Sequence, residues 1–487
     1  MPLYSTNPAA AETGKAVPPF SRAFELARRT LHLPCNRDML TLLLVVALIV
    51  GRIGRASAAE NEVGYRREFY REDDNRISVD TDSAFWDVGL SAHVRLRGTY
   101  TLDSISGATP TGAPPQTQWP FVTYDRLYKN AYAQAYAGAF NQFVAANQIF
   151  VDQGYQTYQQ MTNIAAMVAR STAPGIANNS AGASYRGITN NPNFSNNSVP
   201  LTQMHDRRQG FSIEVPVAWG IQELTPSFSY SDESDYESFG GALIYSLALN
   251  KKNTTLTAGY SHHSDDVRDE NFKWQDKTSD EFLLGVVQLL DPKSYLTFNL
   301  TFGNEAGYLS DPYRAVMVLG NPDYLQSNPD DAALFVEKRP RSRIKGVAYL
   351  SYTRFIDRFN GSLETSYRYF HDSWGIASHT LTLDWHQKLG RNIVLSPSFR
   401  YSNQSAADFY YVLVPDYAGL PAYYSSDYRL THFESFGLGL NFTWRITRFL
   451  SLDLSYLRYV MHGLDGATSQ SAFPSANVGS AGLRLWF

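Results

Sequence analysis

The segment HHSDDVRDE, residues 262–270, places two histidines, three aspartates and one glutamate close together. Imidazole and carboxylate groups of this kind could bind a divalent cation. The spacing matches no established ligand set, and the segment falls in a predicted outer loop. Acidic residues there are commonly solvated or bridged to lipopolysaccharide through Ca²⁺. We therefore predict no specific metal site and keep four residues as weak candidates: His262, His263, Asp265 and Asp266.

Two neighbouring pairs could serve a membrane-embedded hydrolase, which needs a serine and a histidine within hydrogen-bond distance and a polar group that orients the histidine. They are His371 beside Asp372 and His379 beside Ser378. No motif singles out either pair, and such neighbours arise by chance in a long chain. No phosphate-binding glycine loop or zinc signature stands out. We predict that the protein is not an enzyme, has no catalytic residues and carries no cofactor.

A secretory signal is predicted near the N-terminus. The apolar run MLTLLLVVALIV begins at Met39, follows the positive charge of Arg37, and precedes the small-residue site Ala56-Ser57-Ala58. The run is shorter than the roughly 20 residues that a membrane-spanning helix needs. We expect residues 1–58, an atypically long leader, to be removed and residues 59–487 to form a single domain.

Composition excludes several classes for this mature chain. The leader contains Cys35, the only cysteine, so disulfides and thiolate sites are excluded. The leader also holds seven of the 42 Lys and Arg residues and three of the 46 Asp and Glu residues, which leaves a net charge near −8. Such an acidic chain is unlike a nucleic-acid binder, which should be basic.

Strands of period two run through residues 59–487. LTFNLTFG (296–303) and FGLGLNFTWR (436–445) alternate apolar with polar or small residues. We predict 16 strands, with 14 or 18 as alternatives, near 63–72, 76–88, 92–103, 207–218, 221–231, 236–250, 253–264, 277–290, 293–304, 341–355, 358–371, 375–388, 391–403, 432–446, 449–461 and 478–487. Their connections alternate between short turns and longer polar loops. This alternation is typical of antiparallel transmembrane β-barrels and has no reason to occur in a soluble sandwich.

The segment SAGLRLWF, residues 480–487, alternates up to the aromatic Phe487. It is similar to the closing strand of Gram-negative outer-membrane barrels, in which such an aromatic residue is read by the barrel-assembly machinery. The alternative is an ordinary edge strand of a soluble domain. Taken with the strand pattern, the similarity favours an all-β barrel in the outer membrane, with lipid and lipopolysaccharide as its surroundings.

Charged residues of both signs alternate with the apolar ones. Because charges are costly against lipid, we expect them to line the lumen. The predicted lumen-lining residues are His93, Arg95, Arg97, Glu214, Glu364, Arg368, Asp384, His386, Arg400, Arg445, Asp453 and Arg484. They could pair across the lumen and stiffen the wall, or act as a filter for a small polar solute.

A long outer loop is predicted over residues 104–206. Within it, residues 129–170 lose the period of two and show helical spacing, which predicts a helix or helical hairpin. Residues 173–198 are rich in Asn, Ser and Gly and are expected to be mobile. The helical insert could plug the lumen or cap its mouth.

Several segments resemble one bacterial family of uncharacterised outer-membrane proteins: YREDDNRISV (70–79), LDSISGATPTGAP (102–114), DPYR with EKRPRSR (311–314 and 337–343), YRYFHDSWGIASHTL (367–381) and RYSNQSAADFYY (400–411). The resemblance implies secretion and a β-barrel, and supplies no reaction. Family members are described near flavin-transferase genes, which implies a flavin- or redox-linked envelope system. The chain departs from the family pattern at 115–205, where the family's link is usually shorter.

We therefore expect an outer-membrane barrel that acts as a channel or transporter for a small polar solute. The alternative is a closed structural or partner-binding barrel of an envelope system, and an outer-membrane hydrolase is the least favoured. The oligomeric state stays open.

Overall fold

The computed structural model describes residues 61–115, 124–154, 157–189, 198–319 and 332–487. The predicted signal, residues 1–58, lies outside these described residues, and Cys35 with it.

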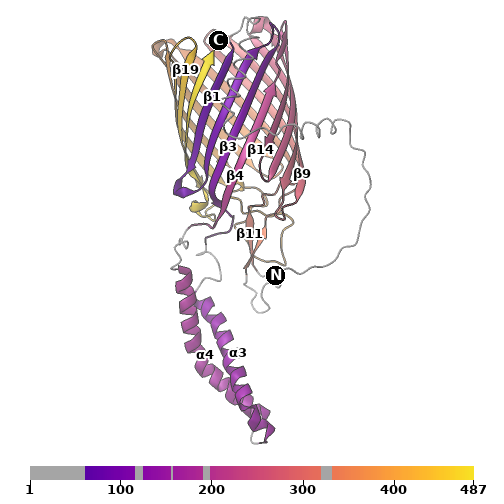
Figure 1. The fold of residues 1–487 in the computed structure, drawn as a ribbon, viewed down its shortest axis with the longest axis vertical. Helices are drawn as coiled ribbons and strands as arrows, with labels where there is room; N and C mark the ends of the chain where they lie inside the picture. The colour runs from indigo at the N-terminus through magenta and orange to yellow at the C-terminus, as the bar shows by residue number, and fades with distance from the viewer. Residues whose placement is uncertain (1–60, 116–123, 155–156, 190–197, 320–331) are drawn as a thin grey trace, which may run out of the picture. The chain divides into compact units, whose positions relative to one another are not determined.

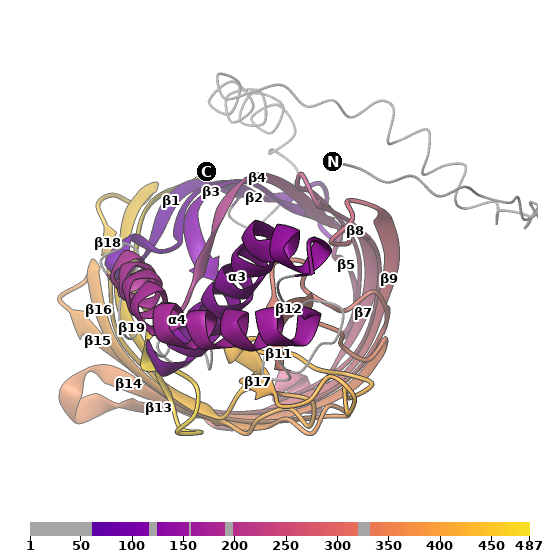
Figure 2. The ribbon, with the colours of Figure 1, turned by 90° about the horizontal axis from the view of Figure 1, so that it is seen from below.

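A closed antiparallel sheet forms the main body of the structure (Figures 1 and 2). Its strands are β1 (Glu62–Glu72), β2 (Ser78–Gly89), β3 (Arg95–Pro110), β4 (Leu201–Glu214), β5 (Val217–Trp219), β6 (Gln222–Asp232), β7 (Tyr236–Leu249), β8 (Thr254–Arg268), β9 (Trp274–Asp291), β10 (Ser294–Gly307), β13 (Ser342–Ile356), β14 (Gly361–Asp372), β15 (Ala377–Leu389), β16 (Ile393–Gln404), β18 (Phe433–Arg445), β19 (Leu450–Gly463) and β20 (Ser475–Trp486). Each strand pairs with its neighbours in chain order, and β1 pairs with β20 to close the ring. Single 3₁₀ turns lie at Asp73–Asn75, Asn250–Lys252, Asp357–Phe359, Tyr428–Leu430 and Gln470–Ala472.

Pro216 divides one strand into two segments. A proline has no amide hydrogen to donate to a sheet, so the ladder is interrupted there. Both β4 and β5 pair with β6, on either side of the interruption. Counting them as one, the seventeen segments make sixteen strands, as predicted.

The register divides the wall into two faces. Directly paired residues point to the same face of a sheet, and successive residues point to opposite faces. Phe442 on β18 pairs with Leu454 on β19, which pairs with Ala481 on β20. Followed around the ring, this side is mainly apolar and exposed: Leu438 is 63% and Phe282 is 55% exposed. We call it the apolar face and the other side the polar face.

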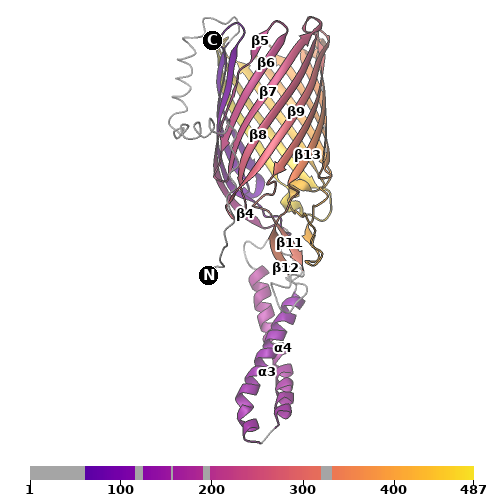
Figure 3. The same ribbon diagram turned by 90° about the vertical axis from the view of Figure 1, so that its right-hand side faces the viewer.

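The strands of the wall run side by side along the barrel (Figure 3). Several reach further toward the loop end than expected. β3 continues to Pro110 and β4 begins at Leu201, so the connection predicted as 104–206 spans 111–200. β8 continues to Arg268, so most of the segment 262–270 belongs to a strand. Its assignment to an outer loop was wrong, because polar residues are acceptable in a strand that continues beyond an apolar band.

The insert consists of two helices, α3 (Tyr124–Asp152) and α4 (Tyr158–Thr189), which lie side by side. The helical prediction is confirmed, but the expectation of a mobile segment was wrong for residues 173–189. In α4 every fourth residue is a small or flexible apolar one and is fully buried: Met161, Ala165, Ala169, Ala173, Ala177 and Ala181. Alanine favours helices and allows close packing, and this outweighs the loop-like composition around it. Whether the hairpin plugs or caps the barrel stays a prediction.

Among the described residues, no helix has an apolar stretch long enough to span a membrane.

A small second sheet in the loops was not predicted. It joins β11 (Ala315–Leu319), β12 (Ala332–Val336) and β17 (Leu413–Val414). β11 pairs antiparallel with β12 and parallel with β17. Its core is formed by buried Val316, Val318, Val414 and Tyr424.

Candidate solute pathway

Eleven of the twelve predicted lumen residues share the polar face. The register places Arg97 opposite Glu214, Glu364 opposite Asp384, and Arg445 opposite Ser451 on this side. The twelfth, His93, lies in the exposed turn between β2 and β3 and faces neither side of a strand. That the polar face borders an aqueous lumen stays a prediction.

Charged residues of the polar face line an open pocket of about 490 Å³ near the end of the barrel where β1 begins and β20 ends. Three basic and three acidic side chains are among its lining: Arg66, Arg97, Arg484, Glu62, Asp87 and Glu214. Arg484 lies 3.3 Å from Glu62 and 3.7 Å from Asp453, so it joins two carboxylates of neighbouring strands.

Three of these lining residues were missed by the sequence analysis: Glu62, Arg66 and Asp87. Asp87 holds Arg95 at 2.7 Å and Arg97 at 3.0 Å, which fixes both predicted arginines against the wall. The first two strands alternate poorly, so their faces could not be assigned from sequence. The register against β3 and β20 supplies the missing information.

The predicted lumen residues Glu364, Arg368, Asp384 and Arg400, on β14 to β16, are less closely paired. Glu364 accepts a hydrogen bond from Ser351 at 3.0 Å, and Arg368 lies 5.5 Å from the centre of the Phe370 ring. Within the described residues, no ion pair joins Arg368 or Arg400 to Glu364 or Asp384. These four charged side chains therefore form no direct ion pair with one another.

At the other end of the barrel, loops from distant strands meet. The Arg314 Nη2 atom lies 2.9 Å from the Thr109 hydroxyl, and the Ala315 amide donates to the Thr111 carbonyl at 2.7 Å. Arg314 belongs to the β10–β13 loop and is also near Asp427 of the β16–β18 loop. In the ring, β10 lies six places from β3 in one direction and β16 six places in the other. Both loops must therefore extend across the opening to meet beside the end of β3.

An ion-pair network ties these loops together, and we call it the mouth network: Asp311, Arg314, Glu337, Arg339, Asp427 and Arg429. Arg339 lies 2.6 Å from Glu337 and 2.8 Å from Asp427, and the side chains of both acids are fully buried. Arg314 lies 3.8 Å from Asp427 and 3.5 Å from Asp311. Arg429 contacts both aspartates.

Burial and charge act in opposite directions within the mouth network. For Asp427, burial alone would raise the pKa, but Arg429, Arg314 and Arg339 outweigh it and hold the pKa well below its usual value. For Glu337, burial outweighs the attraction of Arg339 and raises the pKa to about 6. Removing one partner from a buried charge group costs about 3–5 kcal/mol, so a substitution that removes one charge of the network should destabilise the closed loops.

The packing around this network leaves little space. A cavity of about 20 Å³ is lined by Arg314, Ser426 and Tyr428 among others. That volume accommodates about one water molecule. The loops therefore close this part of the mouth tightly.

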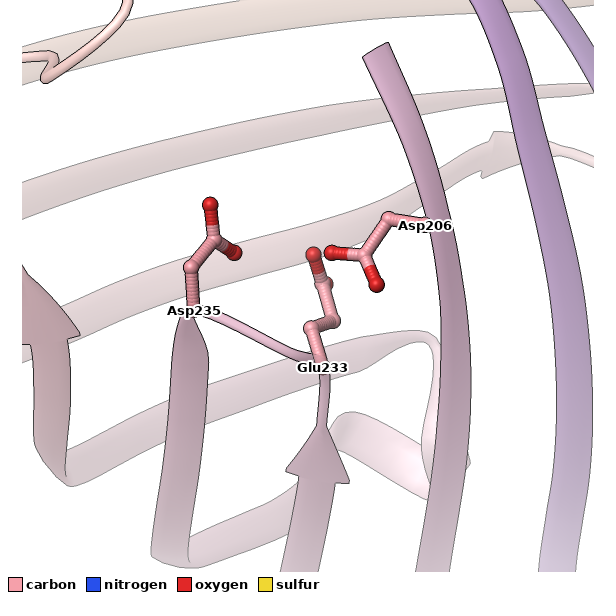
Figure 4. A group of neighbouring side chains, drawn as sticks. All are labelled: Asp206, Glu233 and Asp235. Carbon is pink, nitrogen blue, oxygen red and sulfur yellow. The ribbon is translucent and has the colours of Figure 1, made fainter. Parts of the chain in front are cut away.

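Three carboxylates gather between β4 and the β6–β7 turn: Asp206, Glu233 and Asp235 (Figure 4). One oxygen of each lies within 4.8 Å of the others. Burial, reinforced by the two aspartates and opposed by Arg208, raises the pKa of Glu233 to about 7. Oxygen ligands of this type suit Ca²⁺ or Mg²⁺. Among the described residues, it is the only cluster with this geometry.

The weak metal candidates do not converge, because strand β8 points successive side chains to opposite faces. His262 and Asp266 lie on one face, and His263 and Asp265 lie on the other. His262 contacts Asp280 at 2.9 Å, while Asp265 accepts hydrogen bonds from Tyr236 and Ser238.

The hydrolase candidates are separated in the same way. Ser378 and His379 point to opposite faces, and the His379 ring contacts Tyr367 at 2.6 Å. Asp372 is bound by Arg343 rather than by His371. Neither pair has the geometry of a nucleophile and its base.

Phe487 closes the seam of the ring. Its amide donates to the Asn61 carbonyl, and the Asn61 amide donates to the Phe487 carbonyl, both at 3.1 Å. Its side chain is 45% exposed. Recognition of Phe487 by an assembly machinery stays a prediction.

Comparison with known families gives a match over residues 51–477 to the family described as "Protein of unknown function (DUF3570)". The chain belongs to this family. No curated protein matches the DUF3570 chain.

Among solved structures, the DUF3570 chain is similar to the siderophore receptor PirA from Pseudomonas aeruginosa, at 9% identity and a TM-score of 0.37 over 88% of this chain and 62% of that one. CdiB from Acinetobacter baumannii gives 8% identity and a TM-score of 0.42, over 88% and 60%. A bacterial polysaccharide outer membrane secretin gives 7% and 0.39, over 88% and 98%. The chain thus spans about three-fifths of the length of the first two.

Proposed function

We propose that the protein is an outer-membrane β-barrel that admits a small polar solute through a lumen lined by its polar face. The open pocket of about 490 Å³ carries this proposal. Its walls bring three arginines and three acidic residues from five strands around one space. Balanced charges of this kind can replace the water around a polar solute without favouring strong retention of either ion type.

The membrane setting is supported by the two faces of the wall. The apolar face exposes large apolar side chains on most strands, among them β7 to β10, β13 to β15 and β18 to β20, and matches the lipid-facing side of a transmembrane barrel. In such barrels the short turns lie on the periplasmic side and the longer loops outside. We place the pocket at the periplasmic end accordingly and the mouth network at the outer end.

The mouth network implies a barrel that is closed at rest. A solute would enter only when the loops separate and the ion pairs of the mouth network part. The same closure favours the alternative function, a closed barrel that serves as a structural element or binds a partner. The two-helix hairpin is consistent with this alternative, because it offers a long exposed surface.

Conductance of the refolded protein in planar bilayers distinguishes the two functions. Asp427→Asn removes the carboxylate that three arginines share, so the loops should open more often and conductance should rise severalfold above wild type. The matched control is Asp416→Asn, which changes an exposed aspartate of the same β16–β18 loop and should leave conductance at the wild-type level. A folded Asp427→Asn barrel that passes no current, with or without residues 116–197, would overturn the channel function and leave the closed barrel.

A further inference from the structure

Strands β1 and β2 carry four charged side chains on the apolar face, and we call them the ionic patch: Arg67, Arg71, Asp80 and Asp82. Arg67 pairs with Ala481 in the register, between the pairs formed by Tyr65 with Leu483 and Phe69 with Gly479. It therefore lies within the apolar column of the wall. The Arg67 side chain is 62% exposed.

Arg67 and Asp82 lie in the middle of their strands and are expensive if the wall faces lipid, whereas Arg71 and Asp80 lie near the β1–β2 turn. An arginine at mid-depth costs roughly 2–4 kcal/mol on the lipid side of a barrel. Arg67 lies 4.0 Å from Asp82, at the outer limit of an ion pair, and Arg71 lies 2.6 Å from Asp80. Pairing reduces the net charge but does not replace the lost hydration of either group. A polar surface packed against the patch would replace it.

The wall around the patch is flat. The Trp86 ring lies over Gly98 and the Phe69 ring lies over Gly479, where an added Cβ would come within 2.2 Å and 2.4 Å of ring atoms. Ala84 and Ala481 add only methyl groups on the same face. The aromatic rings can lie against the wall only because these neighbours are small. A flat surface with aromatic and arginine side chains suits contact with another protein wall.

The arrangement of the charges points to a second copy of this chain. Both arginines lie on β1 and both aspartates lie on the neighbouring β2. Consider two barrels related by a two-fold axis along the membrane normal, with their patches facing each other. Strand β1 of one copy then lies opposite strand β2 of the other, at the same height in the membrane. The arginines of each copy then meet the aspartates of the other, as an isologous interface requires.

We propose that the β1–β2 wall joins two copies of the protein in a two-fold dimer, held by the ionic patch. The proposal rests on the membrane setting given under the proposed function, but not on conduction. A lipopolysaccharide headgroup or a different protein could also meet these charges, and both are outcomes of the test below.

The test uses two complementary variants of the full chain, refolded in detergent and weighed by native mass spectrometry. Arg67→Asp with Arg71→Asp makes the patch wholly acidic, and Asp80→Arg with Asp82→Arg makes it wholly basic. Wild type should be dimeric. Each variant alone should lose dimer at least tenfold, and an equal mixture of the two should form heterodimers.

Recovery in the mixture is specific to a self-complementary interface, because neither a lipid nor a foreign protein would restore it. Heat-modifiable migration on gels confirms that each variant forms a barrel. If the variants fail to fold, Phe69→Cys in a Cys35→Ser background tests the same surface by oxidative cross-linking, with Leu438→Cys on β18 as control. A folded monomeric wild type, or equal cross-linking at both positions, would overturn the dimer while leaving the proposed channel intact.

Discussion

Arg400 and Phe399 stand next to each other on β16 and face opposite sides of the wall. Phe399 pairs with Leu438 on the apolar face, and Arg400 pairs with Gly437 on the polar face. The small neighbour leaves room for the guanidinium group. A one-residue difference in position therefore decides whether a charge meets lipid or the proposed lumen.

Exchanging charge at these two positions tests the assignment of the faces. Arg400→Glu should leave the barrel folded and shift its ion selectivity toward cations, because a positive charge in the lumen becomes negative. Phe399→Glu should reduce the yield of folded, heat-modifiable protein severalfold, since it places a carboxylate against lipid. Selectivity is measured from reversal potentials in salt gradients. The opposite pattern would mean that the two faces are reversed.

Individual side chains were predictable where alternation is regular. Arg368, Arg400 and Arg445 lie in strands with clear alternation, and the structure places all three on one face. The argument that arginines avoid the apolar face failed at Arg67 and Arg71. In YRREFYRED the charged residues occupy both parities, so only the register to β20 reveals which ones face outward.

The elements that depend on long-range contacts were less predictable than the strands themselves. β11 and β17 are short and lie about 100 residues apart in the chain, at 315–319 and 413–414. Their pairing exists because two loops meet across the mouth, and no local pattern encodes that meeting. The mouth network was missed for the same reason. Arg314 and Glu337 lie in segments that carry the family resemblance, but no local pattern shows that these loops meet Asp427.

The mouth network should respond to pH through Glu337. Its pKa of about 6 in the fold exceeds its ordinary value of 4.5, so folding favours the protonated form. Its contribution to stability is full below pH 4.5 and is lost as pH rises through about 6, a change of about 2 kcal/mol. The lowered pKa of Asp427 acts only below its ordinary value of 3.8, outside this window. We expect the loops to exchange amide hydrogen faster at pH 7 than at pH 4.5.

Hydrogen exchange of residues 332–338 and 409–428, corrected for intrinsic rates, measures this response. Glu337→Gln should abolish it, because the amide cannot ionise. Glu233→Gln provides a control at a second acid whose pKa is raised, in a different loop, and should leave these segments unchanged. An unaltered pH response in Glu337→Gln would contradict the assignment.

At the scale of the whole molecule, the sixteen-strand ring was predictable because the same local pattern, a connection followed by an alternating strand, recurs along the chain. A short connection brings each strand back antiparallel to the one before it. The alternating pattern then determines which side chains lie on the apolar face and which on the polar face. The helical hairpin lies between β3 and β4, and these two strands still pair as neighbours. The Thr111 amide donates to the Pro200 carbonyl at 2.9 Å, so the chain leaves and re-enters the barrel at neighbouring positions.

Replacing residues 116–197 by a flexible Gly–Ser linker should therefore preserve the barrel. The buried alanine face of α4 packs within the hairpin, and β3 and β4 keep their pairing from Arg97–Glu214 to Pro110–Leu201. We expect heat-modifiable migration and a thermal midpoint within a few degrees of wild type, measured by circular dichroism. Deletion of residues 312–336 is the contrasting variant and should loosen the mouth. Loss of folding without the hairpin would show that the barrel depends on it.

Because β1 pairs with β20, the ring of strands does not depend on which two neighbouring strands the chain leaves unconnected. Strands β1 and β20 pair from Glu62–Trp486 to Glu72–Ala476, and Asn61 is bonded to Phe487 just beyond them. A short linker from 487 to 61 would turn the seam into one more hairpin, and opening the turn at 390–392 would create new ends at the same rim. Such a circular permutant retains every strand pair. In the native chain the β1–β20 pair closes a loop of more than 400 residues, which carries the largest entropic cost of any pairing in the barrel. In the permutant that cost passes to the β15–β16 pair.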